Sequence, residues 1–470
     1  MNEMLDDTET YMAINYDKLE KVINEVHNDL YDFLMCRQID HELYLYFLIE
    51  HPHIPYIKGL PKIHKNTFPL PMRLIVVGNG WVTETISLFL EKKLSPLIQG
   101  IPSILKDTCQ LLDTLNNSFS NGLPDTCVLV TLDVKNLFTS IPNNYGLEAI
   151  RQTLNDSINF TTDEQILFSA LLDMVLSNNV FTFDNRLYLQ RWGVAMGTPC
   201  ANTYANLVVH HWEKSFLFNS LHFTKILLYK RFVDDILLFW NGTPDELTIF
   251  IQYLESTTEF FRFTMEYSYV NINFLDITII KDARVFLSTS LYRKSCWKNT
   301  LLHFNSMHLR FIFRNIIKSQ FTRLTRLCQD PLKLHEQGDL LEDLFLERGY
   351  NPEMVRASKN SILNDTLEAS QFNFRRYKRF HRATNESKVT FITRFISDNK
   401  AIVKVISANW HILTIDTDIK KITGIRLIFT YKNSKNLKRL LCIESNHPEV
   451  RPPRSLNKLG TYPCGKCNMC

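Results

Sequence analysis

The sequence predicts an α+β fold in which helices surround an antiparallel sheet. Two apolar runs rich in β-prone residues carry carboxylates: one delivers Asp133, and the other contains the pair Asp234 and Asp235. Apolar residues recur at helical spacing before residue 50 and again at 309–327, which predicts helices at both places. The two periodicities together indicate mixed secondary structure.

Length and composition limit the possibilities further. A chain of 470 residues is too large for one hydrophobic core, so we expect two or three subdomains. Its 45% hydrophobic and 22% charged residues are ordinary for a globular protein. No apolar run approaches the roughly 18 residues that span a bilayer, and the N-terminal residues do not resemble a signal peptide. We therefore expect an intracellular protein with no membrane partner.

The adjacent acids Asp234 and Asp235 are expected at the tip of a hairpin formed by residues 232–239. Asn-Gly or Asp-Gly suits a tight turn better, and two carboxylates about 4 Å apart repel by roughly 4 kcal/mol at a dielectric of about 20. The pair therefore indicates a bound divalent cation, a raised pKa or a solvated turn. A second strand that delivers Asp133 favours the cation site.

A glycine-containing loop at 193–202 separates the two acidic strands. Thr198 is expected to cap a helix that Pro199 begins, and the glycines are expected to let the backbone approach a flat or charged ligand. Along the chain, a strand with an Asp is followed by a glycine loop that leads into a helix, and then by a hairpin with two adjacent Asp residues. This order is typical of the palm of a template-dependent polymerase.

The amino-acid sequences of several segments indicate one family. "GLPKIHK", "MRLIVVGN", "LVTLDVKNLFTSIP", "GVAMGTPCANTYANL", "YKRFVDDILLFW" and "FLDITI" follow one another in this order. They resemble the reverse transcriptases of Penelope-like retroelements, a group related to telomerase. The resemblance implies a right-hand polymerase with fingers, palm and thumb, which acts in the nucleus on an RNA template, a DNA primer and dNTPs.

The resemblance and the pattern along the chain together predict six regions. They are an N-terminal helical segment (1–50), fingers (51–125), a palm with the catalytic core and an antiparallel sheet (126–282), a basic and mainly helical thumb (283–330), a connector (331–450) and a linker with an incomplete cysteine knuckle (451–470).

Nucleotide addition needs hard oxygen ligands for two Mg²⁺ ions, with Mn²⁺ as a possible substitute. Asp133 and Asp234 are the expected primary ligands, and Asp235 is expected to support them near the primer end. The carbonyl of Val134 can add a backbone ligand. Phe138 matches the aromatic residue that follows the first Asp in the family, so the resemblance implies that it lies under the sugar and favours dNTPs over rNTPs. Alternatively, Phe138 is a core residue.

Further residues are expected around the incoming nucleotide. Arg73 and Lys62 lie in segments that resemble the family's phosphate-binding motifs, so the resemblance implies that they bind the triphosphate. Arg binds phosphate in a bidentate manner and Lys acts as a point charge. Met196, Gly197 and Thr198 are expected beside the templating base, with Gln190 as a weaker candidate just before them.

Basic residues supply candidates for nucleic-acid binding. Residues 283–329 contain no Asp or Glu and nine Lys or Arg. Within them Arg310, Arg314 and Lys318 form a stripe at helical spacing, which indicates either contact with phosphates or a solvated helix face. The other candidates are Lys58, Lys65, Arg293 and Lys294.

The terminal Cys464, Cys467 and Cys470 have the spacing of zinc ligands, but a tetrahedral site needs four. The site is incomplete, completed by a distant residue such as His447, or a remnant. The resemblance implies a further N-terminal segment and a C-terminal GIY-YIG nuclease, neither of which is found in this sequence, so both ends look truncated. Whether a nuclease acts in trans is left open by the sequence. A catalytically inactive or co-opted fragment that binds nucleic acid is the alternative, and an RNA-dependent RNA polymerase is disfavoured by Phe138 and by Val233 before the acids.

Overall fold

The computed structural model describes residues 5–62, 70–294, 296–368, 388–394, 399–415 and 426–432. These form two compact units, one up to Trp297 and one from Lys298 onward. The predicted α+β class with antiparallel sheets is confirmed by the strand pairings. The boundary between the units lies within the stretch predicted as the thumb. None of the helices in the described ranges is long and apolar enough to cross a bilayer.

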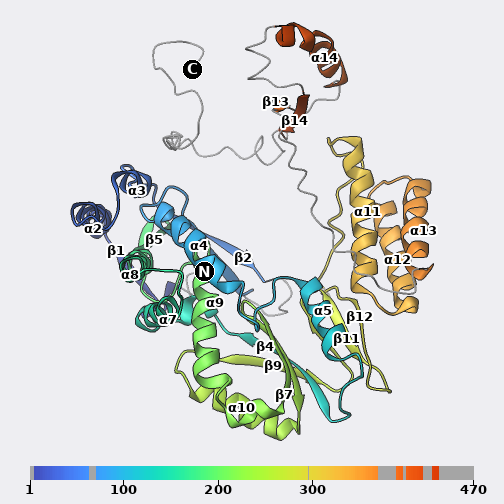
Figure 1. Cartoon of the computed structure of the whole chain (residues 1–470), viewed down its shortest axis with the longest axis horizontal. Coiled ribbons are helices and arrows are strands. Elements are labelled where there is room, and N and C mark those ends of the chain that lie inside the picture. The colour runs from blue at the N-terminus through green and yellow to red at the C-terminus, as the bar shows by residue number, and fades with distance from the viewer. Residues whose placement is uncertain are drawn as a thin grey trace. The chain divides into compact units, whose positions relative to one another are not determined.

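The centre of the first unit is a four-stranded antiparallel sheet in the order β7-β8-β4-β9. Its strands are β7 (Ile226–Phe232), β8 (Asp235–Asn241), β4 (Cys127–Val134) and β9 (Phe263–Ser268). The middle strands β4 and β8 are apolar and buried for most of their length, as expected for strands covered on both faces. Helices α9 (Ala201–Trp212) and α10 (Pro244–Ser256) lie along this sheet (Figure 1).

A five-stranded sheet has the order β1-β6-β5-β2-β3. Its strands are β1 (Tyr11–Ile14), β6 (Arg186–Gln190), β5 (Asn179–Phe183), β2 (Tyr56–Pro61) and β3 (Met72–Val77). The pairing of β2 with β5 is parallel and the others are antiparallel. A third sheet joins β10 (Asn271–Phe274), β11 (Ile277–Lys281) and β12 (Leu287–Leu291).

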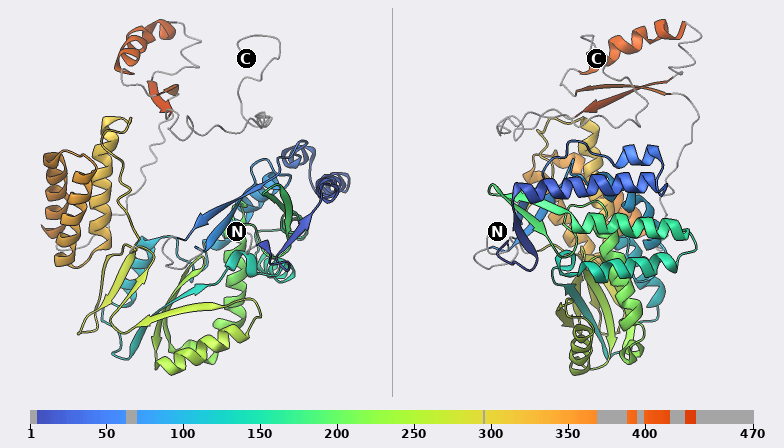
Figure 2. Two further views of the ribbon diagram at one scale, coloured as in Figure 1. Left: turned by 180° about the vertical axis from the view of Figure 1, so that it is seen from behind. Right: turned by 90° about the vertical axis from the view of Figure 1, so that its left-hand side faces the viewer.

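Helices pack around these sheets. They are α2 (Tyr16–Met35), α3 (His41–Phe47), α4 (Glu84–Ile98), α5 (Thr108–Ser118), α6 (Leu137–Ser140), α7 (Asn143–Asn155) and α8 (Thr162–Ser177), with the short η1 (Glu213–Leu217) and η2 (Leu221–Lys225). Helices α2, α7 and α8 are seen end-on in Figure 1 and lengthwise in Figure 2. As predicted, α2 buries one stripe, which consists of Leu19, Val22, Val26 and Leu30.

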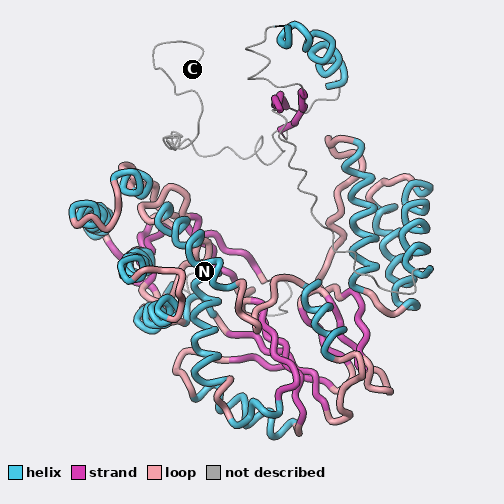
Figure 3. Tube along the Cα trace, viewed as in Figure 1, coloured by secondary structure: helices cyan, strands magenta, loops and turns pink. Residues whose placement is uncertain are grey.

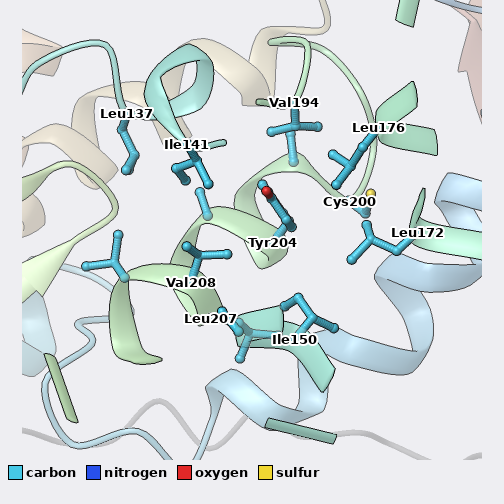
Figure 4. Close-up of a cluster of buried hydrophobic side chains, with 14 of the residues drawn as sticks. Leu137, Ile141, Ile150, Leu172, Leu176, Val194, Cys200, Tyr204, Leu207 and Val208 are labelled. Carbon is cyan, nitrogen blue, oxygen red and sulfur yellow. The ribbon is translucent and has the colours of Figure 1, made fainter. Parts of the chain in front are cut away.

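Helix α9 runs through the hydrophobic core and is buried around most of its circumference. Figure 4 shows Tyr204, Leu207 and Val208 of this helix among apolar side chains that include Leu137 and Leu172. Because α9 follows the glycine loop directly, this core anchors the loop.

In the second unit, helices α11 (Arg310–Leu327), α12 (Pro331–Glu347) and α13 (Pro352–Glu368) lie side by side (Figure 3). Its other described elements are β13 (Lys388–Arg394), α14 (Asn399–Ile415) and β14 (Arg426–Lys432), and β13 and β14 pair in parallel. Helix α11 buries Phe313, Ile317 and Phe321 at helical spacing. The apolar stripe predicted within 309–327 is thus present.

Candidate active site

The predicted carboxylates come together at one end of the β4–β8 pair. Asp133, near the end of β4, is the register partner of Asp235, the first residue of β8. Residues directly opposite on antiparallel strands have Cβ atoms about 5 Å apart. Asp234 precedes Asp235 in the turn, and its carbonyl accepts a hydrogen bond from the Val134 N–H at 3.0 Å. All three predicted catalytic residues therefore lie within one small region.

The turn differs from the prediction that both acids occupy its tip. Phe232 pairs with Asp235, so the two turn residues are Val233 and Asp234, and Asp235 belongs to the strand. Val233 has a φ of 58°, a left-handed conformation that is rare for a β-branched residue. Such a residue costs about 1–3 kcal/mol and persists only where surrounding contacts hold it. The strain lies immediately before Asp234.

The surroundings of Asp235 shift the pKa of its carboxyl. Although the residue as a whole is exposed, partial burial of its carboxyl, followed by the negative charges of Asp234 and Asp133, raises its pKa to about 6. Lys294 and Arg73 lower this pKa and offset part of the effect. Arg73 was expected at the triphosphate and Lys294 on nucleic acid, and both are thus close enough to act on the Asp235 carboxyl.

A cavity of about 290 Å³ opens beside the carboxylates. Its lining includes eight residues that the sequence assigns to catalysis or nucleotide binding: Lys62, Arg73, Asp133, Val134, Phe138, Gln190, Met196 and Asp234. A cavity of this size can hold part of a nucleotide. Residues from β2, β3, β4, β6, the β7–β8 turn and the glycine loop therefore meet around one space.

Gly197, in contrast, does not line this cavity. It lines a neighbouring one of about 50 Å³ together with Thr198 and Trp81. The loop needs glycine at positions 193 and 197 because Gly193 and Gly197 have φ angles of +67° and +117°. In addition, a Cβ at Gly193 would lie 2.1 Å from the Phe138 carbonyl oxygen, and a Cβ at Gly197 would lie 2.1 Å from the Val76 carbonyl oxygen. The close approach made possible by these glycines is thus to the protein's own backbone.

Two backbone hydrogen bonds fasten the glycine loop to the cavity walls. The Val194 N–H donates to the Phe138 carbonyl at 2.8 Å, and the Val76 N–H donates to the Met196 carbonyl at 2.7 Å. The loop therefore fixes Phe138 and Met196 on the cavity lining.

The prediction that Thr198 caps the helix is wrong. Helix α9 begins at Ala201 with Cys200 at its N-cap, and no side chain caps it. The Thr198 N–H donates to the Ala195 carbonyl, and the Thr198 carbonyl accepts from Ala201 N–H, both at 3.1 Å. These bonds place Thr198 in a turn that precedes the helix, a use of Thr that local pattern does not distinguish from a cap.

The N-terminal segment also contributes to the cavity, which its local sequence did not predict. Asp7, Thr10 and Tyr11 line the cavity, because β1 pairs with β6 so that Tyr11 is opposite Gln190. Asp7 accepts hydrogen bonds from the backbone and side chain of Thr10, which form a local turn. The turn was detectable in the sequence, but its placement depends on a long-range strand pairing.

The predicted nucleic-acid-binding residues are distributed over both units. In the first unit Lys58 lies over the Tyr56 ring at 5.0 Å, and Arg293 lies over the Trp297 ring at 5.4 Å. In the second unit Arg310, Arg314 and Lys318 are exposed on α11, beside its buried stripe. Lys65, Cys464, Cys467 and Cys470 lie outside the described residues.

A magnesium site needs hard oxygen ligands, which Asp133, Asp234 and Asp235 can provide. Among the described residues no three His, Cys, Asp or Glu side chains already form a cluster that would hold an ion. Asp133, Asp234 and Asp235 nevertheless fit Mg²⁺ in chemistry, because they offer hard carboxylate oxygens and their mutual repulsion would be relieved by a cation.

Comparisons with known proteins give the following matches. Residues 300–360 match a family described as the animal helix-turn-helix domain, which covers α11, α12 and part of α13. A search among curated proteins returns no match.

Two telomerases are among the similar solved structures. Telomerase from Candida albicans, in complex with a TWJ fragment of telomeric RNA, is 11% identical, with coverage of 68% of this chain and 60% of that chain and a TM-score of 0.48. Apo telomerase from Candida tropicalis is 14% identical, with coverage of 67% and 56% and a TM-score of 0.42. This chain thus spans at most 60% of the length of either.

Proposed function

We propose that this chain is an RNA-directed DNA polymerase that adds dNTPs to the 3′-hydroxyl of a primer. One observation carries the proposal: Asp133, Asp234 and Asp235 lie at the end of the β4–β8 pair, and Asp133 and Asp234 line a cavity together with Arg73 and Lys62. Neighbouring carboxylates next to cationic groups suit the binding of a metal–triphosphate complex.

Each of these residues would have its own role in nucleotide addition. Asp133 and Asp234, with the Val134 carbonyl, would hold two Mg²⁺ ions, and Asp235 would support them. When bound, these ions would stabilise the charge on the attacking and leaving oxygens at the α-phosphate. Arg73 and Lys62 would bind the triphosphate and orient it for in-line attack.

The cavity wall also suggests how the sugar is selected. Phe138 lies on the lining, and its carbonyl is fixed by the Val194 N–H. We propose that the ring lies under the sugar and leaves no space for a 2′-hydroxyl. The substrate would then be a dNTP.

The template and primer require a positively charged surface. The exposed row Arg310, Arg314 and Lys318 on α11 supports such a contact, and the match of residues 300–360 to a helix-turn-helix family is consistent with it. We propose an RNA template and a DNA primer as partners. An origin in a Penelope-like retroelement, a nuclease in trans and activity in the nucleus stay predictions from the sequence.

Primer extension by the purified full chain tests the proposal. We expect extension of a DNA primer on an RNA template with Mg²⁺ and dNTPs, and we expect Asp234→Asn to abolish it while primer–template affinity changes by less than about twofold. Asp113→Asn, an exposed acid on α5 away from the cavity lining, is the matched control and should keep wild-type activity.

Two outcomes would contradict the proposal. Binding of primer–template without incorporation by the wild-type protein would favour a catalytically inactive fragment that binds nucleic acid. Preferential incorporation of rNTPs would favour an RNA-dependent RNA polymerase.

A further inference from the structure

Arg231 and Glu213 form a completely buried ion pair close to the Asp234 turn. Arg231 lies in β7, three residues before Asp234, and both side chains of the pair are 0% exposed. The Arg231 Nε donates to Oε1 of Glu213 at 2.7 Å. Replacement of such a pair by apolar residues is often neutral or even stabilising, so fold stability alone is a weak reason for its presence. The remaining contacts of the pair indicate another role.

The Arg231 guanidinium connects helix α9 to the turn. Nη1 donates to the Asn206 side-chain oxygen at 2.7 Å and to the Val233 carbonyl at 3.0 Å, and Nη2 donates to the Asn206 carbonyl at 3.2 Å. The planar fork of arginine allows these bonds at the same time as the bond to Glu213. Helix α9 is itself anchored in the core, so the Val233 carbonyl is tied to a rigid element.

Glu213 is fixed by its own set of donors. Ser103 Oγ and Tyr229 OH donate to its carboxylate at 2.8 and 2.9 Å, and His210 Nδ1 lies 3.3 Å from it. Burial alone would raise the pKa of Glu213, but Arg231, His210 and Ser103 together lower it to about 2. Glu213 also begins the π-helical turn η1, a feature that often occurs at functional sites.

The turn is thereby held on two sides. The Val233 carbonyl is bound by Arg231, and the Asp234 carbonyl is bound by the Val134 N–H of β4. Between these bonds lies the backbone that carries Asp234, with Val233 in its left-handed conformation. We propose that Arg231 is a positioning residue that, through the Val233 carbonyl, holds Asp234 in place for metal binding; this rests on the polymerase function proposed above.

Three variants separate positioning from fold stability. Arg231→Lys keeps a charge near Glu213, but its single nitrogen cannot reproduce the fork to Asn206 and Val233. Arg231→Met combined with Glu213→Leu removes both charges, so neither is left buried and unpaired. Tyr229→Phe is the matched control, because it removes another hydrogen bond to Glu213 and leaves the Val233 contact intact.

We expect both Arg231 variants to require about tenfold more Mg²⁺ for half-maximal primer extension, the usual scale for a group that orients a metal ligand. At saturating Mg²⁺ and dNTP, kcat should fall more than the KM for dNTP changes. Binding of Mn²⁺, measured by electron paramagnetic resonance without turnover, should weaken by a similar factor. Amide exchange in the peptide 128–138, which contains Val134, should be faster than in the wild type. Tyr229→Phe should match the wild type in all four measurements.

The inference is wrong if the Arg231 variants keep the wild-type Mg²⁺ requirement and exchange rates, because the ion pair would then only support the fold. It is also wrong if Tyr229→Phe shifts the metal requirement as much as Arg231→Lys does. Failure of the wild-type protein to extend primers would contradict the polymerase proposal instead, and the exchange measurement would still report whether Arg231 holds the turn. Arg231→Lys alone decides the question if the double variant does not fold.

Discussion

Asp133 lies directly opposite Asp235 in the antiparallel pairing of β4 with β8. The candidate site is therefore a property of the register between two buried strands rather than of the acidic hairpin alone. A slip of one residue would turn either side chain to the other face of the sheet. This register depends on the apolar residues along β4 and β8, whose burial fixes which face each strand presents.

Removal of the Asp235 charge should stabilise the protein in the absence of divalent cations. Asp235→Asn relieves the repulsion from Asp133 and Asp234, and we expect a gain of about 1 kcal/mol after solvent screening at this exposed residue. Thermal unfolding in EDTA measures the effect, and Mg²⁺ should reduce the difference. Asp113→Asn is the control, and a lower melting temperature for Asp235→Asn in EDTA would contradict the expected repulsion.

The Glu213 carboxylate predicts a pH dependence of stability. Its folded pKa of about 2 lies below the ordinary value of 4.5, so its contribution is complete above about pH 4.5 and is lost as the pH falls toward 2. We expect the difference in free energy of unfolding between wild type and Glu213→Gln to be constant above about pH 5 and to shrink below it. Denaturant titrations between pH 3 and 7 measure this difference; one that grows toward acid pH would show the opposite sign.

Gly197→Ala should disrupt the loop. An added Cβ would lie 2.1 Å from the Val76 carbonyl at a φ of +117°, so the bond between Val76 and Met196 must break or shift. We expect a loss of more than about 2 kcal/mol in the free energy of unfolding, with lower affinity for dNTP. Gly100→Ala is the matched control, because a Cβ there meets nothing within 4 Å, and it should change stability by less than about 1 kcal/mol.

Phe138→Ala should relax the choice of sugar. Because the ring lines the cavity, its removal opens space where a 2′-hydroxyl would fit, and we expect the ratio of rNTP to dNTP incorporation to rise by at least about tenfold. Single-nucleotide extension with each substrate measures the ratio. An unchanged ratio with a lower melting temperature would show that Phe138 is a core residue.

The basic face of α11 should contribute to nucleic-acid binding through phosphates. Replacement of Arg310, Arg314 and Lys318 by Gln is expected to weaken primer–template binding and to reduce the slope of log K against log salt by about two to three. Arg151→Gln on α7, whose guanidinium lies 4.0 Å from Glu148, is the control and should leave the slope unchanged. An unchanged slope in the triple variant would identify this row as a solvated helix face.

Local sequence patterns correctly predict those helices and strands whose formation depends mainly on their own residues. Apolar periodicity predicts the strand that carries Asp133 and the helical stripe from Leu19 to Leu30. It likewise predicts the burial of Phe313 and Phe321 in α11. The cap at Thr198 was mispredicted because the same residue types suit a turn, and only the surrounding hydrogen bonds distinguish the two uses.

The order of the acidic strands and the glycine loop follows from the sequence, because neighbouring residues encode apolar periodicity and turn chemistry. The folded chain adds that Asp133 is opposite Asp235, that Tyr11 lines the cavity wall, and that Arg231 binds the Val233 carbonyl. These contacts join segments through strand register and burial. Both depend on the packing of the whole core rather than on any local pattern.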